Sequence, residues 1–555
     1  MKFLSSLFIA FFLSLTMYSS ASSQLPVFTH QDTLRGSITK EREWWDLTYY
    51  HLNIKVNPAE KSIAGTNTIE YRVLKPLQVM QIDLQNPMEI TKVVQDEQKL
   101  QFNRHGNAYF VNLIKTQKTG DINTLTVFYR GKPKISRRPP WDGGLTWSKD
   151  RDGNDFIATT CQGDGASLWW PCKDHLYDEP DSMLISVTVP EKLFEVSNGR
   201  LKSININGDG TKTFHWFVSN PINNYNVNVN IGNYVNFTEK YHGENGVLDC
   251  SYYVLRYNLE KARKQFKEVP RMLKAFEYWF GPYPFYKDSY KLVEVPYTGM
   301  EHQSSVTYGN GYKNGYMGND VSHTGWGMKF DFIIVHESGH EWFGNSITDR
   351  DIADMWIHES FIAYSENLFL NYYYGKKASA EYVLGTRQNI RNDRPIIGIY
   401  NVNYEGSGDM YYKGANMLHT LRQIVDDDNK WRSILRGLNK KFYHQTVTSA
   451  QIENYLTKHT GINLAPFFNQ YLRDVRIPVL EYIISDSTFQ YRWNNCVKNF
   501  NMPVKVCFNE KVQWIHPTVR WQTLKTPVTV EKFILDPNFY AASFNLRGNA
   551  DNCKF

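Results

Sequence analysis

The chain contains a His-Glu-x-x-His motif, formed by His336, Glu337 and His340, directly after the apolar run of residues 332–335. Positions i and i+4 of an α-helix share one face, so both imidazoles can point at one cation while Glu337 stands beside it. The pattern therefore predicts a helix that carries a metal site, and the rest of the fold has to be built around it.

Glu359 supplies a third ligand, separated from His340 by 18 intervening residues, within the stretch Trp356-Ile357-His358-Glu359. Two imidazoles and one carboxylate leave a fourth position for water, which is the pattern of a catalytic zinc site and not of a structural one. We therefore expect one Zn²⁺ per chain, although this ligand set also suits other divalent ions. The alternative interpretation is a surface helix with solvated His and Glu side chains.

Glu337 is the expected general base of such a site, because it lies next to a ligand without being one. A zinc ion would lower the pKa of a bound water and polarise a carbonyl oxygen. Glu337 could then accept a proton from the water and pass it to a leaving amine. These residues predict hydrolysis of an amide bond and do not by themselves say which bond.

Hydrophobic patterning predicts a multidomain α+β fold with β, then mainly helical, then β structure. Alternation of apolar and polar residues from about Trp45 to Phe237 predicts antiparallel sheet, including a strand through Tyr225, Val227, Val229 and Ile231. Helical spacing dominates from about residue 255 to 473, and alternation returns after Pro478 at Val504, Val506, Phe508, Val528 and Val530. We expect an N-terminal antiparallel β domain at 24–240, a catalytic domain at 241–475 and a small C-terminal β-sandwich-like domain at 476–555.

The first helical segment has apolar residues every three to four positions from Leu259 to Phe280. Such spacing predicts an amphipathic helix of about six turns. Pro270 lies inside the pattern and is expected to kink the helix or split it in two, and Gly281 with Pro282 is expected to end it.

Beyond the ligands, the zinc motif resembles the gluzincin aminopeptidases, the family of aminopeptidase N and the leukotriene hydrolase. The resemblance implies a thermolysin-like catalytic domain and extends to Gly299-Met300-Glu301, which is similar to the family's Gly-x-Met-Glu-Asn exopeptidase motif. It implies that Glu301 binds the free α-amine of the substrate and that Gly299 and Met300 also bind substrate, with Met300 near the pocket for the first side chain. A carboxylate near the metal can pair with an ammonium group and so select the bond that meets the water. The chain departs from the family pattern at Thr298, His302, His358 and Ser360.

Three further residues acquire roles from the same resemblance. Tyr411, in Tyr411-Tyr412-Lys413-Gly414, is similar to the family tyrosine that donates a hydrogen bond to the tetrahedral oxyanion, whereas Tyr412 is interpreted as a packing residue. Gln162 lies in a segment that resembles the loop holding the substrate's N-terminus. Glu366 could orient a zinc-ligating histidine from the second shell, or could face solvent.

Residues 1–23 have a cationic start, a short apolar run and a small-residue end, which predicts a secretory signal peptide. We therefore expect an exported protein, periplasmic, on the cell surface or extracellular. No later apolar stretch predicts a membrane span. Export permits disulfides among the six cysteines, and Cys496 and Cys507 flank a segment that a hairpin could close. The sequence ends soon after the helical region, which suggests a short form without the large C-terminal helical domain of many relatives.

The resulting hypothesis is a secreted zinc aminopeptidase that acts on peptides with a free N-terminus. Its alternatives are a zinc endopeptidase of the thermolysin type and a catalytically impaired peptide-binding relative. A net charge of +6 over 555 residues does not favour nucleic acid as a partner, because such binding needs clustered Lys and Arg. The preferred N-terminal residue and the oligomeric state stay open at this point.

Overall fold

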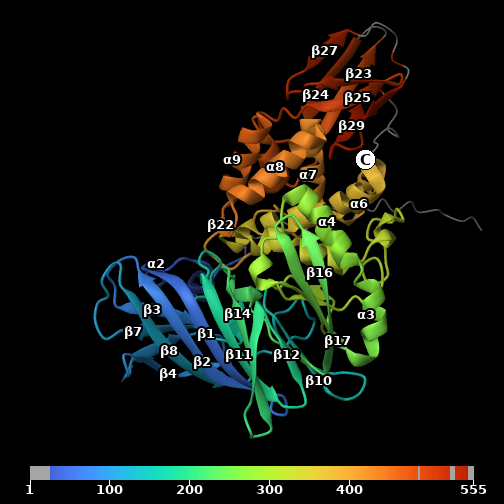
Figure 1. Ribbon diagram of the computed structural model, residues 1–555. Coiled ribbons are helices and arrows are strands. Elements are labelled where there is room, and N and C mark those ends of the chain that lie inside the picture. The colour runs from blue at the N-terminus through green and yellow to red at the C-terminus, as the bar shows by residue number, and fades with distance from the viewer. Residues whose placement is uncertain (1–25, 486–487, 526–529, 531, 548–555) are drawn as a thin grey trace, which may run out of the picture.

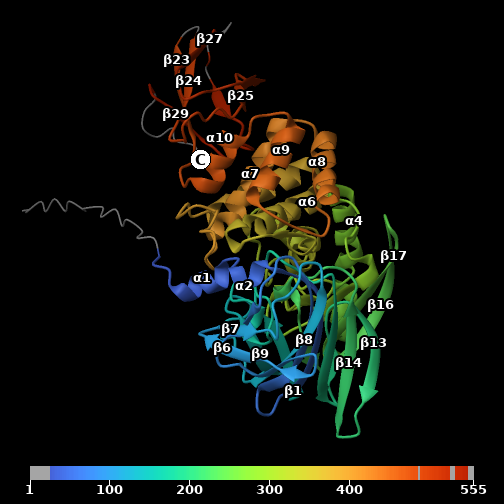
Figure 2. The same cartoon turned by 90° about the vertical axis from the view of Figure 1, so that its left-hand side faces the viewer.

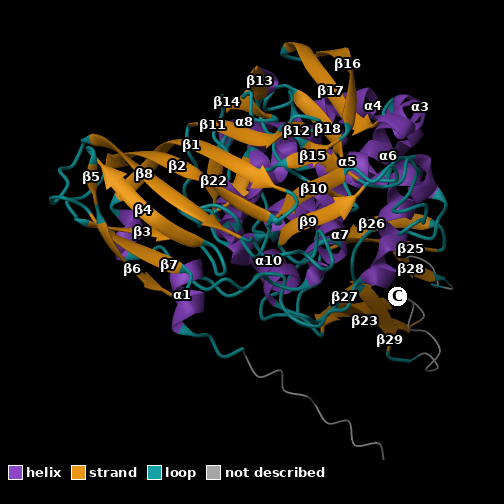
Figure 3. Ribbon diagram, turned by 90° about the horizontal axis from the view of Figure 1, so that it is seen from below, coloured by secondary structure: helices purple, strands orange, loops and turns teal. Residues whose placement is uncertain are grey.

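The computed structural model describes residues 26–485, 488–525, 530 and 532–547. A β-rich N-terminal part, a mainly helical middle part and a smaller β-rich C-terminal part follow one another along the chain and in space (Figures 1 and 3). This arrangement confirms the expected α+β fold class. The expected leader at 1–23, Val528 and Cys553 lie outside the described residues.

The N-terminal part is built on an eight-stranded sheet with the order β13-β14-β11-β1-β2-β8-β4-β5. Its neighbouring strands are antiparallel except β1 and β11, which pair in parallel from Tyr49–Ser182 to Lys55–Thr188. The expectation of a purely antiparallel sheet is wrong at this junction. The chain first builds β2, β8, β4 and β5 on one side of β1 and later returns to the opposite edge of β1 with β11. The strands are β1 (Trp45–Asn57), β2 (Ser62–Val73), β4 (Glu89–Gln95), β5 (Gln98–Lys99), β8 (Ile122–Gly131), β11 (Ser182–Pro190), β13 (Arg200–Ile206) and β14 (Thr211–Val218).

Two smaller sheets complete this part, with the orders β12-β15-β10-β9 and β3-β7-β6. Their strands are β3 (Val79–Asp83), β6 (Gln101–His105), β7 (Ala108–Asn112), β9 (Gly144–Lys149), β10 (Asp155–Thr160), β12 (Phe194–Val196) and β15 (Asn230–Gly232).

The strand predicted through residues 225–231 forms only at its end, in β15, and residues 224–226 make a 3₁₀ turn instead. The reason lies in buried asparagines that alternate with the apolar residues. Their amides bond to distant backbone carbonyls, Asn224 to Lys173 at 2.6 Å and Asn228 to Ser305 at 3.1 Å. These side-chain bonds take the place of a strand ladder.

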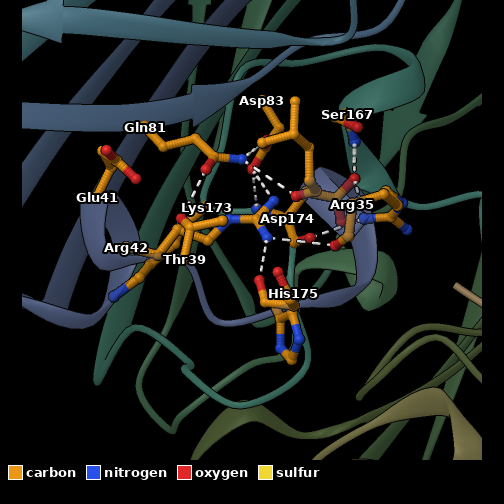
Figure 4. Close-up of polar contacts among 12 residues, drawn as sticks. Arg35, Thr39, Glu41, Arg42, Gln81, Asp83, Ser167, Lys173, Asp174 and His175 are labelled. Atoms are coloured by element: carbon orange, nitrogen blue, oxygen red, sulfur yellow. Dashed lines mark hydrogen bonds and ion pairs between the residues drawn. The ribbon is translucent and has the colours of Figure 1, made fainter. Parts of the chain in front are cut away.

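An arm made of α1 (His30–Gly36) and α2 (Lys40–Glu43) lies between the β domain and the helical region (Figure 2). Two ion pairs hold it in place: the buried pair of Arg42 with Asp83, and the pair of half-buried Arg35 with Asp174, each at 2.7 Å (Figure 4). The Asp174 backbone N–H also donates to Asp83 at 3.0 Å, so the two pairs form one cluster. The arm is therefore held by charge as well as by packing.

Replacing Arg42 with Met should destabilise the N-terminal domain by about 3 kcal/mol, because it leaves Asp83 charged and buried without its cation. The midpoint of urea unfolding followed by circular dichroism measures this. Arg72→Met is the matched control, since Arg72 meets Asp46 only at 4.0 Å with both side chains about half exposed; we expect a change within about 0.5 kcal/mol. Equal effects of the two substitutions would contradict the importance of the buried pair.

The middle part begins with a five-stranded sheet of order β16-β17-β18-β20-β19. Its strands are β16 (Tyr234–Gly243), β17 (Gly246–Leu255), β18 (Tyr290–Glu294), β19 (Gly299–Met300) and β20 (Val306–Tyr308), so residue 240, the expected end of the first domain, falls within β16. The predicted split of the first helical segment is confirmed, with α3 (Leu259–Gln265) and α4 (Glu268–Phe280). Pro270 lies in the first turn of α4, where the missing N–H costs little, and Gly281 ends this helix with φ 98°.

The remaining helices pack around a buried aromatic and aliphatic core that is continuous with the C-terminal part. Within the described ranges, no helix combines the length and the apolar character needed to cross a bilayer. The helices are α5 (Phe332–Gly339), α6 (Trp356–Gly385), α7 (Tyr412–Val425), α8 (Asp428–Lys441), α9 (Ser449–Thr460) and α10 (Ala465–Arg473), with a short parallel pair of strands β21 (Ile347–Asp349) and β22 (Gln445–Val447).

The C-terminal part consists of two small sheets, β27-β24-β23-β29 and β26-β25-β28. Phe489 of one sheet packs on Phe508 and Phe533 of the other, with ring centroids 4.8 and 5.0 Å apart, as expected for a sandwich. The strands are β23 (Val479–Ser485), β24 (Thr488–Asn494), β25 (Val504–Phe508), β26 (Lys511–Ile515), β27 (Gln522–Lys525), β28 (Phe533–Leu535) and β29 (Ala542–Asn545).

The suggested disulfide between Cys496 and Cys507 is absent from the described structure, where both are free thiols. Val506 and Phe508 of β25 point into the core, so Cys507 faces the opposite side of the strand. Cys496 instead packs against the core from the end of β24. Cys507 therefore points away from the core on which Cys496 packs, and the two thiols stay apart.

Candidate metal centre and substrate cleft

The two histidines of the motif lie on and just after α5, and Glu359 lies in the first turn of α6. The Asp331 side chain caps α5 by accepting from the Ile334 N–H at 3.3 Å. All residues of α5 are buried, so the helix is fixed in the core. The helix contacts α6. The structure thus brings His336, His340 and Glu359 together in a buried site, as the spacing predicts.

The ligand atoms fit a single metal ion. The Nε2 atoms of His336 and His340 lie 3.7 and 3.6 Å from Oε2 of Glu359, and the three donor atoms all lie within 4.8 Å of one another. Oε2 of Glu359 is buried and has no hydrogen-bond partner among the described residues. An unpaired buried carboxylate oxygen facing two imidazole nitrogens is a suitable place for a divalent cation.

Both imidazoles are held through their other nitrogen. Nδ1 of His336 lies 2.8 Å from Oε1 of Glu366, and Nδ1 of His340 lies 3.0 Å from the carbonyl oxygen of Phe343. Oε2 of Glu366 in turn accepts from the Tyr382 hydroxyl at 2.6 Å. Such contacts set the ring orientation and leave Nε2 free for a metal. Glu366 is therefore placed to orient His336 and does not face solvent.

Two more carboxylates, Glu337 and Glu301, lie beside the ligands. Both are buried, and one oxygen of each lies within 4.8 Å of a ring nitrogen of His340 and of the other carboxylate. Burial is the main cause that raises the pKa of both carboxyl groups, and repulsion from neighbouring carboxylates adds to it. This crowding of like charge favours cationic occupants, namely a metal ion and an ammonium group.

Glu301 is held from three sides by polar groups of both domains. Its Oε1 accepts from Nε2 of Gln162 at 2.7 Å and from the hydroxyl of Tyr225 at 3.1 Å, while Nδ2 of Asn345 donates to its backbone carbonyl at 2.8 Å. Asn226 fixes Asn345 through a 2.8 Å bond between their amides. The structure thus places Gln162 on the proposed amine-binding carboxylate.

Tyr225 and Asn345 are contacts that sequence reasoning assigned to no role. The sequence predicts Tyr225 only as a strand residue and gives Asn345 no role. Neither carries a local signal for this contact, because Tyr225 lies 76 residues from Glu301 in the chain and meets it only through the fold.

Gly299 and Met300 form β19, which pairs antiparallel with β20 and runs past α5. A Cβ atom on Gly299 would lie 2.6 Å from Cγ2 of Ile333 and 3.2 Å from Cγ of Glu337. Only glycine allows this close approach of the strand to the zinc helix. The strand therefore lies directly against the expected general base.

Tyr411 precedes α7, and its ring stacks on that of His336 with centroids 6.0 Å apart. Its backbone carbonyl accepts from the Ala415 N–H at 2.9 Å, and the preceding carbonyl, of Met410, accepts from Oγ of Ser360 at 2.7 Å. Burial raises the pKa of the Tyr411 phenol well above its usual value. The hydroxyl therefore stays protonated and can donate a hydrogen bond beside the metal centre.

The departures from the family pattern are accommodated by local contacts. Ser360 makes the bond to Met410 just described. The ring of His358 meets Asp349, with Nε2 and Oδ1 3.0 Å apart in a buried contact. Burial lowers the pKa of His302 to about 3, so this side chain is neutral within the core. None of these three replaces a ligand or the expected base.

All of the predicted metal, base and substrate residues except Glu366 line one cleft of about 820 Å³. The N-terminal domain contributes Pro140, Trp141 and residues 162–164, and the helical region contributes the other walls. A cleft of this size can enclose a small peptide.

A buried site of two histidines and a glutamate on facing helices, with a second glutamate beside it, defines the gluzincin class of metallopeptidase. Two family models agree with this class: the Peptidase M1 N-terminal domain matches residues 47–225, and the Peptidase family M1 domain matches residues 264–471. The chain belongs to peptidase family M1.

Known relatives and structures are similar over large parts of the chain. Aminopeptidase B of Mus musculus is 21% identical over 503 residues, which are 81% of this chain and 72% of that protein. Probable aminopeptidase 1 of Sulfurisphaera tokodaii is 21% identical over 360 residues, 61% of this chain. This chain spans only 44% of the length of that relative. A mutant M1 zinc metallopeptidase of Deinococcus radiodurans has the same fold, with a TM-score of 0.65 and 20% identity over 78% of this chain and 95% of that one.

Proposed function

We propose that the chain is a zinc-dependent aminopeptidase that hydrolyses the first peptide bond of peptides with a free N-terminus. The observation that carries the proposal is the position of Glu301, a buried carboxylate held by Gln162 and Tyr225 beside Glu337 and the ligand His340. A fixed anion at that place suits an ammonium group and admits only one residue before the scissile bond. The names of the relatives and a structure of the Deinococcus radiodurans enzyme with the substrate Tyr-Ser-Ala support this substrate class.

In this proposal each side chain has one task. Zinc, when bound by His336, His340 and Glu359, supplies a Lewis acid that polarises the carbonyl and acidifies water. Glu301 pairs with the α-ammonium group and sets the register of the peptide. Glu337 takes a proton from the attacking water and delivers it to the nitrogen of the departing amine. The hydroxyl of Tyr411 donates to the oxygen that becomes negative in the tetrahedral intermediate.

A comparison of free and N-acetylated peptides of the same sequence tests the proposal. We expect kcat/KM for the free peptide to exceed that for the acetylated one by at least about 30-fold, because acetylation removes the charge that pairs with Glu301. Similar rates on both would favour the thermolysin-type endopeptidase. If the chain binds zinc and peptide but hydrolyses neither the free nor the acetylated peptide, the result would favour an impaired peptide-binding relative.

Export is part of the same proposal and rests on the leader-like composition of residues 1–23. Sequencing the N-terminus of the protein recovered outside the cytoplasm tests it. A recovered chain that still begins at Met1 would contradict removal of a signal peptide.

A further inference from the structure

The cleft has an uneven distribution of charge. Of the described residues that line it, Arg394 is the only Lys or Arg, whereas five are carboxylates: Asp164, Glu301, Glu337, Glu359 and Glu405. The proposed function uses Glu301, Glu337 and Glu359 for an ammonium group, a proton and a metal. It assigns no task to Arg394.

Arg394 is held in place within the loop between α6 and α7. Its NH2 group donates to the carbonyl oxygen of Gly406 at 3.0 Å, and its guanidinium lies 5.7 Å from the ring centroid of Tyr404. Among the residues that the structure describes, Asp393 is the only carboxylate within ion-pair distance of Arg394, at 3.9 Å, which is near the limit for such a contact. About 44% of the side chain stays exposed. The guanidinium thus keeps donor capacity for a further anion, since one of its five N–H groups is used by Gly406.

The loop that carries Arg394 is joined to the segment that holds the amine anchor. Nδ2 of Asn403 donates to the carbonyl oxygen of Gly163 at 2.8 Å, directly after Gln162. Tyr404, which the guanidinium faces, follows Asn403 in the chain. A substrate held by Glu301 and Gln162 is therefore bound beside this loop, in the cleft that Arg394 also lines.

We propose that Arg394 binds a carboxylate of the substrate and makes the cleft selective for peptides that carry one close to the scissile bond. The inference rests on the proposed aminopeptidase function. A guanidinium recognises a carboxylate with two parallel hydrogen bonds, which a neutral amide cannot reproduce. The carboxylate can be the C-terminus of a very short peptide or the side chain of an acidic first residue, and the two sources can be separated by experiment.

Two pairs of substrates separate them. The first pair is Ala-Ala-Ala as the free acid and as the C-terminal amide, and the second is Glu-Ala-Ala-amide with Gln-Ala-Ala-amide. We expect the wild-type chain to prefer the carboxylate member of at least one pair by about tenfold in kcat/KM. Arg394→Gln should abolish that preference, and Arg394→Lys should retain part of it. Arg391→Gln is the matched control, because Arg391 is an exposed arginine of the same loop that does not line the cleft.

A preference within the first pair that Arg394→Gln abolishes identifies the C-terminal carboxylate as the group bound. The same result in the second pair identifies the side chain of an acidic first residue. The inference is overturned if the wild type shows no preference in either pair, or if Arg394→Gln leaves the preference within twofold. Dissociation constants of the same four peptides, measured by calorimetry on a zinc-loaded Glu337→Gln background, do not depend on turnover. If the zinc-loaded wild-type chain hydrolyses none of the four peptides but binding still shows a preference that depends on Arg394, the proposed function alone is overturned. If the wild-type chain hydrolyses them rapidly without any such preference, only the role of Arg394 is overturned.

Discussion

Replacing Glu337 with Gln should lower kcat by about 10² to 10⁴-fold, which is the usual contribution of a positioned acid–base group. Glutamine keeps the size of the side chain but cannot accept the proton of the attacking water. Glu337 is not needed to hold the metal, because His336, His340 and Glu359 form the ligand set without it. We therefore expect zinc content to stay at one ion per chain and peptide dissociation constants to change little. Metal analysis, steady-state kinetics and calorimetry measure these three quantities.

The matched control is Glu260→Gln, at a position in α3 where the side chain is 89% exposed. This variant should keep wild-type kcat, because its charge is solvated and lies outside the cleft. Residual activity of Glu337→Gln within tenfold of the wild type, with zinc bound, would show that another group removes the proton. Loss of zinc from the variant would instead show that Glu337 acts on the metal site and not on the water.

The zinc site could be predicted from the sequence because its information is local. His336 and His340 are one helical turn apart, and Glu359 lies at a fixed spacing from them in the first turn of the next α-helix. The same applies to the break shortly before Pro270 and to the end of the helix at Gly281, where a single residue changes the backbone chemistry. Fold class was also predictable, because the change of hydrophobic period from two to about 3.6 separates sheet from helix over long stretches.

Contacts that join distant segments could not be predicted in the same way. The bond from Tyr225 to Glu301 spans 76 positions, and the parallel pairing of β1 with β11 depends on the path of everything between them. The asparagines around Tyr225 alternate with apolar residues, and such alternation predicts a strand with one buried face and one exposed polar face. Here both faces are buried, and the amides bond to remote carbonyls. The alternation can be seen in the sequence, but the carbonyl groups to which the asparagine amides bond cannot be predicted from it.

Replacing Tyr411 with Phe should lower kcat by about 100-fold, the usual effect of removing one hydrogen-bond donor from an oxyanion. The loss should fall on kcat more than on KM, because the hydroxyl interacts most strongly with the charge that develops in the transition state. The ring itself would stay in place, since the stacking on His336 and the backbone bonds around residues 410–415 do not involve the hydroxyl. Zinc content should therefore be unchanged, which separates this effect from damage to the metal centre.

Tyr412→Phe is the control that makes the Tyr411 result specific. Tyr412 is the next residue, also lines the cleft and also has a phenol whose pKa is raised mainly by burial. The ring stacked on His336, however, is that of Tyr411, because the first turn of α7 turns the following side chain away. We expect Tyr412→Phe to keep kcat within about threefold, as for a substitution away from the reacting atoms. Equal losses in both variants would mean that removing any hydroxyl from this wall disturbs the cleft, and a large loss only in Tyr412→Phe would transfer the oxyanion role to that residue.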